Sequence, residues 1–79
     1  MARVRKIEPG KQDVQVHPTE VDAYVQSAVA KDGTVYFHLS TFGSANRISK
    51  PKSSQSIQLD SVRAAELIEE IYKVFPHLK

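Results

Sequence analysis

Residues 56–76 read SIQLDSVRAAELIEEIYKVFP, and this stretch decides the fold. Its first four residues alternate between polar and apolar side chains, which is typical of a half-buried strand. From residue 61 onward the apolar side chains recur at steps of three and four, which predicts an amphipathic helix over residues 61–75. We therefore expect a strand that leads directly into a helix, with Ile57 and Leu59 facing that helix. The apolar stripe of the helix consists of Ala64, Leu67, Ile68, Ile71 and Phe75.

Both ends of this helix carry signals that fix its length. A side-chain oxygen of Asp60 or Ser61 can accept a hydrogen bond from an unpaired amide of the first turn. Pro76 ends the helix, because a proline pushes the residue before it out of the α region. On the polar face we expect Glu69 and Lys73 to form an ion pair across one turn.

Residues 34–42 (TVYFHLSTF) predict another strand, because β-branched and aromatic residues dominate them. Both faces of this strand carry aromatic side chains, so the face away from the helix is expected to be covered or used. Lys31, Asp32 and Gly33 before it form a hairpin turn signal. The predicted strand places Val35, Phe37, Leu39 and Thr41 on one face and Tyr36, His38, Ser40 and Phe42 on the other.

Residues 20–30 (EVDAYVQSAVA) fit two structures. In a strand, alternate residues from Val21 to Val29 would line one face. In a helix, an apolar stripe would run through the same valines, and Thr19 with Asp22 would resemble a capping box. The Asp-Gly turn that follows and the valine content favour the strand. Residues 14–17 (VQVH) are interpreted as a further short strand.

The order of elements predicts one α+β domain of 79 residues. We expect a three- to four-stranded antiparallel meander followed by one C-terminal helix packed on one face, with residues 13–79 forming the domain and residues 1–12 a basic flexible arm. A chain of this size buries only about 60% of its unfolded surface. It has no cysteine to form disulfides. Small domains compensate by self-association, so we expect a homodimer.

The composition argues against several function classes. The three histidines are scattered and lack the spacing of metal ligands, so no metal or cofactor is expected. There is no nucleophile elbow and no glycine-rich phosphate loop, so we expect neither an enzyme nor a small-molecule substrate. No apolar run approaches the ~20 residues of a membrane span. The N-terminal residues lack the apolar core of a secretory signal, which together with the lack of cysteine indicates the cytoplasm.

Positive charge gathers in two segments of the chain. The thirteen residues 43–55 contain three cations and no acid, and connections of this length are often functional. Cations neutralise phosphates, and hydroxyl and amide groups donate to phosphate oxygens. A solvated loop is the alternative interpretation. The loop cations are Arg47, Lys50 and Lys52, and the arm adds Arg3, Arg5 and Lys6, whose charge is either a second contact or incidental.

The aromatic side chains Tyr36, His38 and Phe42 are candidates for stacking on unpaired bases, with Tyr24 beside them. The alternative for these rings is packing in the core or at a dimer interface. His38 alone does not make a catalytic base, because no nucleophile or carboxylate pair accompanies it in the sequence.

About half of the chain resembles the transcriptional positive-cofactor single-stranded DNA-binding family in its order of elements. The resemblance rests on VYFHL at residues 35–39, the loop cations, the strand of Ile57 and Leu59, and the helix start at Asp60. It implies a curved antiparallel sheet with one C-terminal helix, dimerisation through the helices and binding of single strands on the basic sheet side. The chain departs from the family in having no tryptophan and in reading SQSI where a basic-Gly-Ile approach is typical. The same stretch is similar to small uncharacterised bacterial proteins, which imply no function.

These features lead to two main hypotheses. The first is a non-enzymatic nucleic-acid-binding module, with single-stranded DNA preferred, in which loop and arm cations contact phosphates and the rings stack on bases. The second is a protein-interaction or accessory subunit, whose sheet face around Tyr24, Tyr36 and Phe42 docks a partner or a second copy. A minimal enzyme built around His38 is the least favoured hypothesis.

Overall fold

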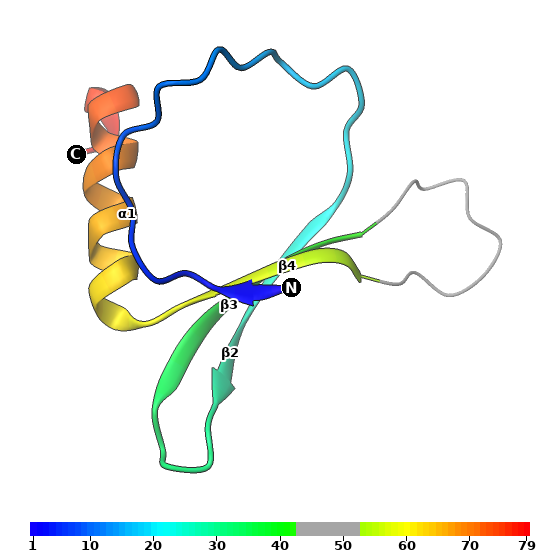
Figure 1. The fold of residues 1–79 in the computed structure, drawn as a ribbon, viewed down its shortest axis with the longest axis vertical. Coiled ribbons are helices and arrows are strands. Elements are labelled where there is room, and N and C mark those ends of the chain that lie inside the picture. The colour runs from blue at the N-terminus through cyan, green and yellow to red at the C-terminus, as the bar shows by residue number, and fades with distance from the viewer. Residues whose placement is uncertain (43–52) are drawn as a thin grey trace, which may run out of the picture.

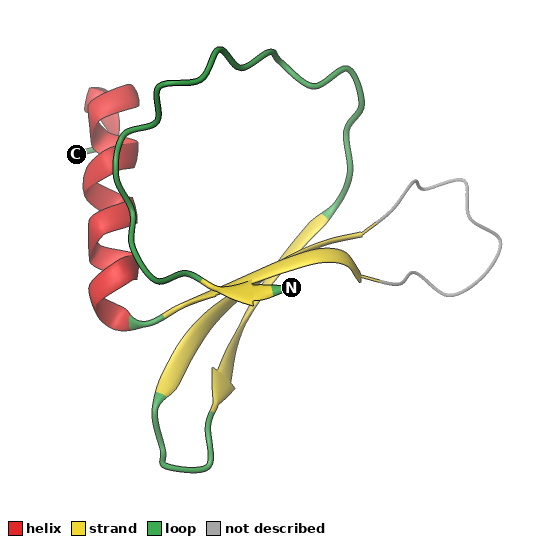
Figure 2. Cartoon of the chain, in the orientation of Figure 1, coloured by secondary structure: helices red, strands yellow, loops and turns green. Residues whose placement is uncertain are grey.

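The computed structural model describes residues 1–42 and 53–79 of the chain. These residues form a mixed sheet followed by one helix, so the predicted α+β class is confirmed (Figures 1 and 2). The strands are β1 (Ala2–Arg3), β2 (Ala23–Val29), β3 (Val35–Phe42) and β4 (Ser53–Leu59), the helix is α1 (Ser61–Val74), and a single 3-10 turn, η1 (Pro76–Leu78), follows it.

Strands β2, β3 and β4 pair in sequence order and antiparallel, as the predicted meander requires. Residues 20–30 therefore contain a strand and not a helix. Strand β1 joins the other side of β4 in parallel, with Ala2 opposite Ile57. The strand order β1-β4-β3-β2 is thus not a simple meander. Strand β1 was not predicted, because it lies in the segment, residues 1–12, that was expected to be a flexible arm.

The hairpin between β2 and β3 is built around the predicted turn. Gly33 has a φ of 92°, a left-handed conformation that glycine adopts without strain. Its N–H donates to the carbonyl of Ala30 over 2.9 Å, and the N–H of Thr34 donates to Oδ1 of Asp32 over 3.0 Å. The hydrogen bonds from Thr34 lower the pKa of the Asp32 carboxyl. The turn thus fixes the register of both strands.

Helix α1 begins and ends where the sequence predicts, to within one residue. The Asp60 side chain caps it, because its Oδ1 accepts from the N–H of Arg63 over 2.7 Å. The predicted pair of Glu69 with Lys73 is corrected: Lys73 Nζ lies 3.1 Å from Oε1 of Glu70 instead. Residues three apart are also neighbours on a helix surface, so this pairing is equally accessible.

The helix does not lie flat on the sheet. It rises from the end of β4 and stands away from the strands over most of its length (Figure 1). Among the described apolar residues only Leu59 is buried, with 2% of its surface exposed. The radius of gyration is 14.8 Å, against about 12 Å for a compact domain of this length. The predicted position of Leu59 facing the helix is confirmed, but the core is confined to the corner between β4 and α1.

One predicted strand and one predicted boundary are wrong. Residues 14–17 form no strand; they belong to a long exposed connection between β1 and β2 (Figure 2). Their alternating pattern fits a strand, but none of the described strands pairs with them. Strand β4 begins at Ser53, so residues 53–55 belong to the sheet and not to the basic loop.

Candidate nucleic-acid interface

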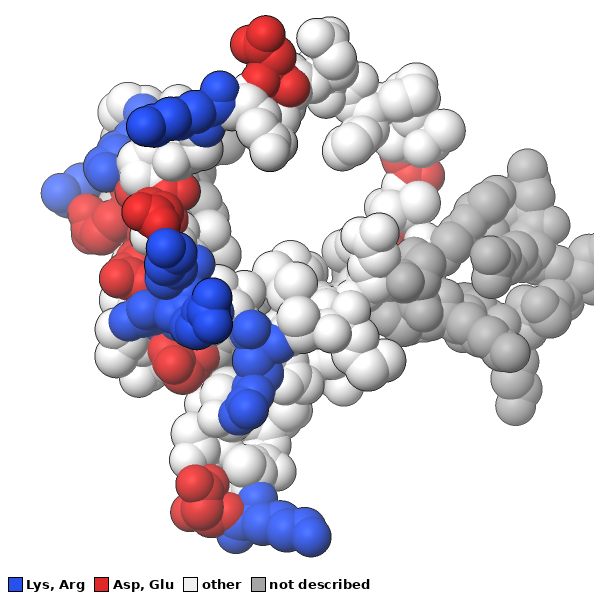
Figure 3. All heavy atoms as spheres, viewed as in Figure 1, with Lys and Arg blue, Asp and Glu red and all other residues white. Residues whose placement is uncertain are grey.

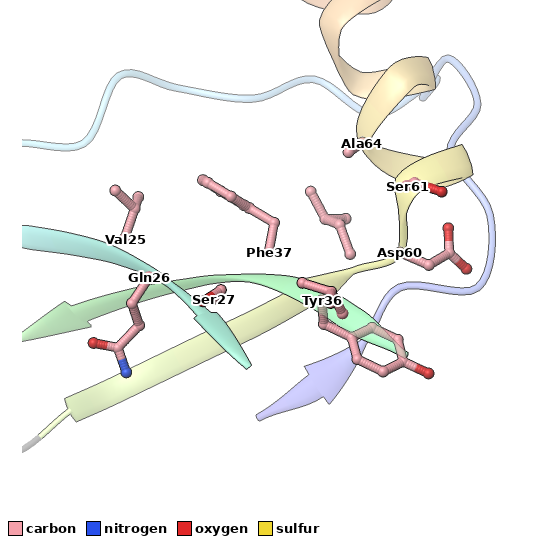
Figure 4. A pocket seen from close by; sticks show the side chains of 10 residues that line it. Val25, Gln26, Ser27, Tyr36, Phe37, Asp60, Ser61 and Ala64 are labelled. Carbon is pink, nitrogen blue, oxygen red and sulfur yellow. The ribbon is translucent and has the colours of Figure 1, made fainter. Parts of the chain in front are cut away.

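The sheet presents two chemically different faces. Residues paired across antiparallel strands share a face, so the pairing of Ser27 with Phe37 and of Phe37 with Leu59 marks the helix side. Figure 4 shows Val25 and Phe37 on that side and Tyr36 on the other. We call the side away from the helix the ring face. It carries Arg3, Tyr24, Tyr36, His38, Phe42 and Gln58.

Three of the predicted stacking residues lie on this face along a single strand. Tyr36, His38 and Phe42 all belong to β3. At about 3.4 Å per residue, the six steps from Tyr36 to Phe42 span roughly 20 Å. The rings are therefore arranged in a row, which suits a linear ligand better than a compact one.

Strand β1 brings one cation of the N-terminal segment to this row. Nη1 of Arg3 donates to the hydroxyl of Tyr36 over 3.2 Å. The guanidinium carbon also lies 5.8 Å from the centre of the Tyr36 ring, within the range of a cation–π interaction. The parallel pairing of β1 with β4 is what places Arg3 here, because Arg3 lies opposite Gln58 in that register. A positive charge thus flanks the first ring of the row.

Gln58 also lies on the ring face, although the sequence did not identify it as a candidate site residue. Its Nε2 donates to Nδ1 of His38 over 3.0 Å. An amide nitrogen only donates, so Nδ1 of His38 is the acceptor in this contact. Gln58 therefore holds the ring of His38 in one orientation. The alternation of Gln58 with Ile57 and Leu59 in the sequence could have placed it on this face.

Tyr24 and Phe42 form an aromatic pair at the end of the sheet where the β3–β4 connection begins. Their ring centres are 4.9 Å apart and their planes meet at 82°, an edge-to-face arrangement. Tyr24 is exposed, whereas Phe42 is only partly so. This pair extends the row of rings onto β2.

The other two arm cations are arranged differently. Arg5 lines a shallow groove of about 330 Å³ together with Arg3, Tyr36 and the acid Asp60. Its carbonyl accepts a hydrogen bond from Nη1 of Arg63 over 2.7 Å, which fixes the backbone there. Lys6 instead pairs with a neighbouring acid, because its Nζ lies 2.8 Å from Oε1 of Glu8. Figure 3 shows how cations and acids alternate along this segment and the helix.

The three loop cations, Arg47, Lys50 and Lys52, lie outside the described residues. Their contact with a ligand stays a prediction. The connection that contains them follows Phe42 directly, and Phe42 belongs to the ring face. The described parts of the chain contain no cluster of three His, Asp or Glu residues that could hold a metal ion. They also contain no helix that is long and apolar enough to cross a membrane.

No protein-family model, curated protein or solved structure matches the chain. The resemblance described above therefore stays an expectation from the sequence.

Proposed function

We propose that this chain is a non-enzymatic nucleic-acid-binding module that binds single-stranded DNA on the ring face. The observation that supports the proposal most is that Arg3, Tyr36 and His38 lie together on the ring face, where Arg3 contacts Tyr36 directly. Aromatic faces stack on unpaired bases with little regard to sequence, at about 1–3 kcal/mol per base. A guanidinium beside them neutralises a phosphate. The module needs no cofactor, and we place it in the cytoplasm.

The preference for a single strand follows from the geometry of stacking. Bases in a duplex are already stacked on each other, so their faces are not accessible to protein rings. Aromatic side chains instead stack on bases that are splayed out of a single strand. A row of rings along β3, about 20 Å long, offers stacking sites to successive bases of such a strand.

The cations have unequal parts in the proposal. Arg3 contacts the phosphate next to the base on Tyr36, and Arg5 lies in the adjoining groove. Lys6 contributes less, because Glu8 offsets its charge. The loop cations, predicted from the sequence alone, would extend the phosphate contacts beyond Phe42.

Fluorescence polarisation with labelled single-stranded and double-stranded oligonucleotides tests the proposal. Each phosphate contact on a single strand contributes about −0.7 to the slope of log affinity against log salt. Raising the salt from 50 to 200 mM should therefore weaken binding about 20-fold for three contacts and about 300-fold for six. The double reversal K50E/K52E should weaken binding of every sequence alike. Equal affinity for both oligonucleotides, or an affinity insensitive to salt, would overturn the proposal.

A second candidate function is a protein-interaction or accessory subunit. The observation that favours it is the apolar helix side of the sheet, where Val25 and Phe37 remain exposed. A complex that survives high salt, formed by a chain that retains no oligonucleotide, would support this function over the first.

A further inference from the structure

The two edges of the sheet differ in how they are covered. Strand β1 pairs along β4 in parallel, and the N–H of Val4 continues this pairing by donating to the carbonyl of Gln58 over 2.9 Å. Strand β2 lies at the opposite edge and pairs with β3 alone among the described strands. The described part of the chain therefore covers the edge at β4 and leaves the edge at β2 open.

Hydrogen bonds at the two ends of the β2–β3 pair show which residues of β2 point their backbone groups outward. The N–H of Phe42 donates to the carbonyl of Asp22 over 3.0 Å, and the N–H of Ala30 donates to the carbonyl of Thr34 over 2.8 Å. The register between these pairs is regular, and hydrogen-bonded pairs alternate with non-hydrogen-bonded pairs along antiparallel strands. The even-numbered residues of β2 therefore bond to β3. The residues whose N–H and C=O groups face outward are Ala23, Val25, Ser27 and Val29.

The same odd-numbered residues carry their side chains on the helix side of the sheet. Val25 and Ser27 line an open groove of about 480 Å³, together with Phe37 of β3 and Leu59 at the corner with α1 (Figure 4). Val25 and Val29 keep 60% and 67% of their surface exposed. A strand laid along β2 would satisfy the outward backbone groups and cover these apolar side chains at the same time. Its residues opposite the odd-numbered ones would share their face, so they should be apolar.

Strand β2 lacks the features that commonly keep an edge strand from pairing. Such edges usually contain a proline, a charged side chain or a bulge. The seven residues AYVQSAV contain neither proline nor a charged residue, and their pairing with β3 has no register shift. An unprotected edge with apolar side chains at alternate positions is typical of sites that bind a peptide by strand addition.

Charges at the two ends of β2 give an added strand its direction. Glu20 and Asp22 precede β2 and are exposed, and neither carboxylate forms a salt bridge with another described residue. Lys31 follows β2, whereas Asp32 beside it accepts a hydrogen bond from the N–H of Thr34. The last residues of an antiparallel strand would lie beside Asp22 and its first residues beside Lys31. A strand with a basic C-terminal end therefore matches these charges.

We propose that β2 is a docking edge for an extended peptide segment of another protein, which joins the sheet as a further antiparallel strand. The segment has apolar residues at alternate positions, facing the groove, and Lys or Arg at its C-terminal end, beside Glu20 and Asp22. Main-chain hydrogen bonds supply the affinity and the alternate side chains supply the selectivity. The site goes beyond nucleic-acid binding and does not depend on it, because the groove and the ring face lie on opposite sides of the sheet.

The charges favour such a segment over β2 of a second copy. Two β2 strands can pair antiparallel with all their outward residues matched only if Val25 lies opposite Ser27. That register brings Glu20 of each copy toward Asp32 of the other, and like charges opposite each other are destabilising. A segment that ends in Lys or Arg instead pairs opposite charges.

Fluorescence polarisation with the labelled synthetic peptide TVTVTVKKK tests the docking edge. The control peptide VVVTTTKKK has the same composition and charge without the alternation, and it should bind at least tenfold more weakly. The reversed peptide KKKVTVTVT should also bind more weakly, because its charges match only in the less stable parallel direction. A parental chain that does not bind TVTVTVKKK at 1 mM, or binds all three peptides equally, would overturn the proposal.

The double variant E20Q/D22N tests the charges at the start of β2. It should raise the dissociation constant of TVTVTVKKK about three- to tenfold, because two exposed charge pairs are lost. E69Q/E70Q removes the same charge from α1 and is the matched control, which should bind as the parent does. Equal affinities of both double variants would contradict the proposed direction of the strand.

Amide hydrogen exchange, followed by nuclear magnetic resonance, tests the contact on the unmodified chain. In the free protein the amides of Val25, Ser27 and Val29 should exchange fast, whereas those of Gln26 and Ala28 are protected by β3. Saturating TVTVTVKKK should slow the three odd-numbered amides by at least tenfold. If they are already protected in the free chain, a second copy or another segment occupies the edge and the proposal is wrong. Peptide binding that leaves their exchange unchanged would contradict it too.

The variant S27P tests the outward backbone groups. Proline is tolerated on an edge strand where the missing N–H would face solvent, so S27P should stay folded by circular dichroism. It should bind TVTVTVKKK about tenfold more weakly or worse, because it cannot donate to the added strand. A28P removes an amide that bonds to β3 and should destabilise the sheet. A folded S27P protein with the parental affinity for the peptide would refute the docking edge. Oligonucleotide binding by S27P should match the parent, so the ring face is tested by its own assay.

Discussion

Replacing Tyr36 with alanine should weaken binding of single-stranded DNA by about 5- to 150-fold. The range follows from the loss of one base stack, about 1–3 kcal/mol, converted at 1.4 kcal/mol per factor of ten. Tyr36 also holds Arg3 by a hydrogen bond of 3.2 Å and a cation–π contact at 5.8 Å. That contact exists in the free and in the bound protein, so its loss changes the affinity less than the loss of the stack does.

The conservative variant Y36F separates the two effects. It keeps the ring and removes only the hydroxyl that accepts from Arg3. An exposed hydrogen bond contributes about 0.5–1.5 kcal/mol to the fold, and the affinity for DNA should change by less than about threefold. Polarisation titrations of the parent, Y36A and Y36F with a labelled thymidine oligonucleotide give the three dissociation constants. Y72A, which removes a tyrosine of the helix, controls for ring removal elsewhere.

Circular dichroism shows whether each variant is folded before binding is compared. A folded Y36A protein whose affinity changes by less than twofold would refute the role of the ring in stacking. A Y36F protein that loses as much affinity as Y36A would assign the effect to the hydroxyl and Arg3. Either result would require a different binding surface or a different contact from the one proposed.

Three further predictions concern stability. D60A should lower the free energy of unfolding by about 1 kcal/mol in urea titrations, because it removes the cap on the N–H of Arg63, and D60S should restore most of it. G33A should cost about 1–2 kcal/mol in the same assay, since φ is 92° there and no neighbouring atom crowds the added carbon, so strain alone acts. D32N should be less stable than the parent at pH 7. Thr34 lowers the pKa of Asp32 in the folded chain, so the carboxylate stabilises the fold fully above its ordinary pKa of 3.8. This stabilisation is lost as the pH falls through the lowered pKa of the folded chain. The melting temperatures of D32N and the parent should therefore converge between pH 7 and pH 2.

The sequence predicted the elements whose signals are local. The apolar stripe, the cap at Asp60 and the stop at Pro76 define α1, and all three act within a few residues. The turn at Gly33 resolved residues 20–30 as a strand, because a hairpin needs a partner on each side of the turn. The division of β3 into two faces followed from alternation alone.

Features that depend on distant partners were not predictable. Strand β1 has two residues, too few for any period, and exists because the edge of β4 accepts it from the other end of the chain. Residues 14–17 have the period of a strand, but none of the described strands pairs with them. The expected packing of α1 on the sheet also failed over most of its length. The stripe shows that Ile71 should be covered, but it does not show which surface covers it.

For the candidate site, too, the sequence predicted what alternation within one strand determines and did not predict contacts between strands. Tyr36, His38 and Phe42 were assigned to one face by their spacing, and the structure places them there. Arg3 was selected only for its charge, and its contact with Tyr36 follows from the unpredicted strand β1. The contact of Gln58 with His38 depends on the register of β3 with β4, which no short segment encodes.

Side-chain chemical shifts during titration with single-stranded DNA test the ring face most directly. A chain of 79 residues suits such a measurement by nuclear magnetic resonance. We predict that the ring signals of Tyr36 and His38 and the side-chain amide of Gln58 shift, while the methyl signals of Val25 on the helix side stay in place. If the methyl signals of Val25 shift and the ring signals do not, the nucleic acid binds the helix side or does not bind the sheet, and the account is wrong.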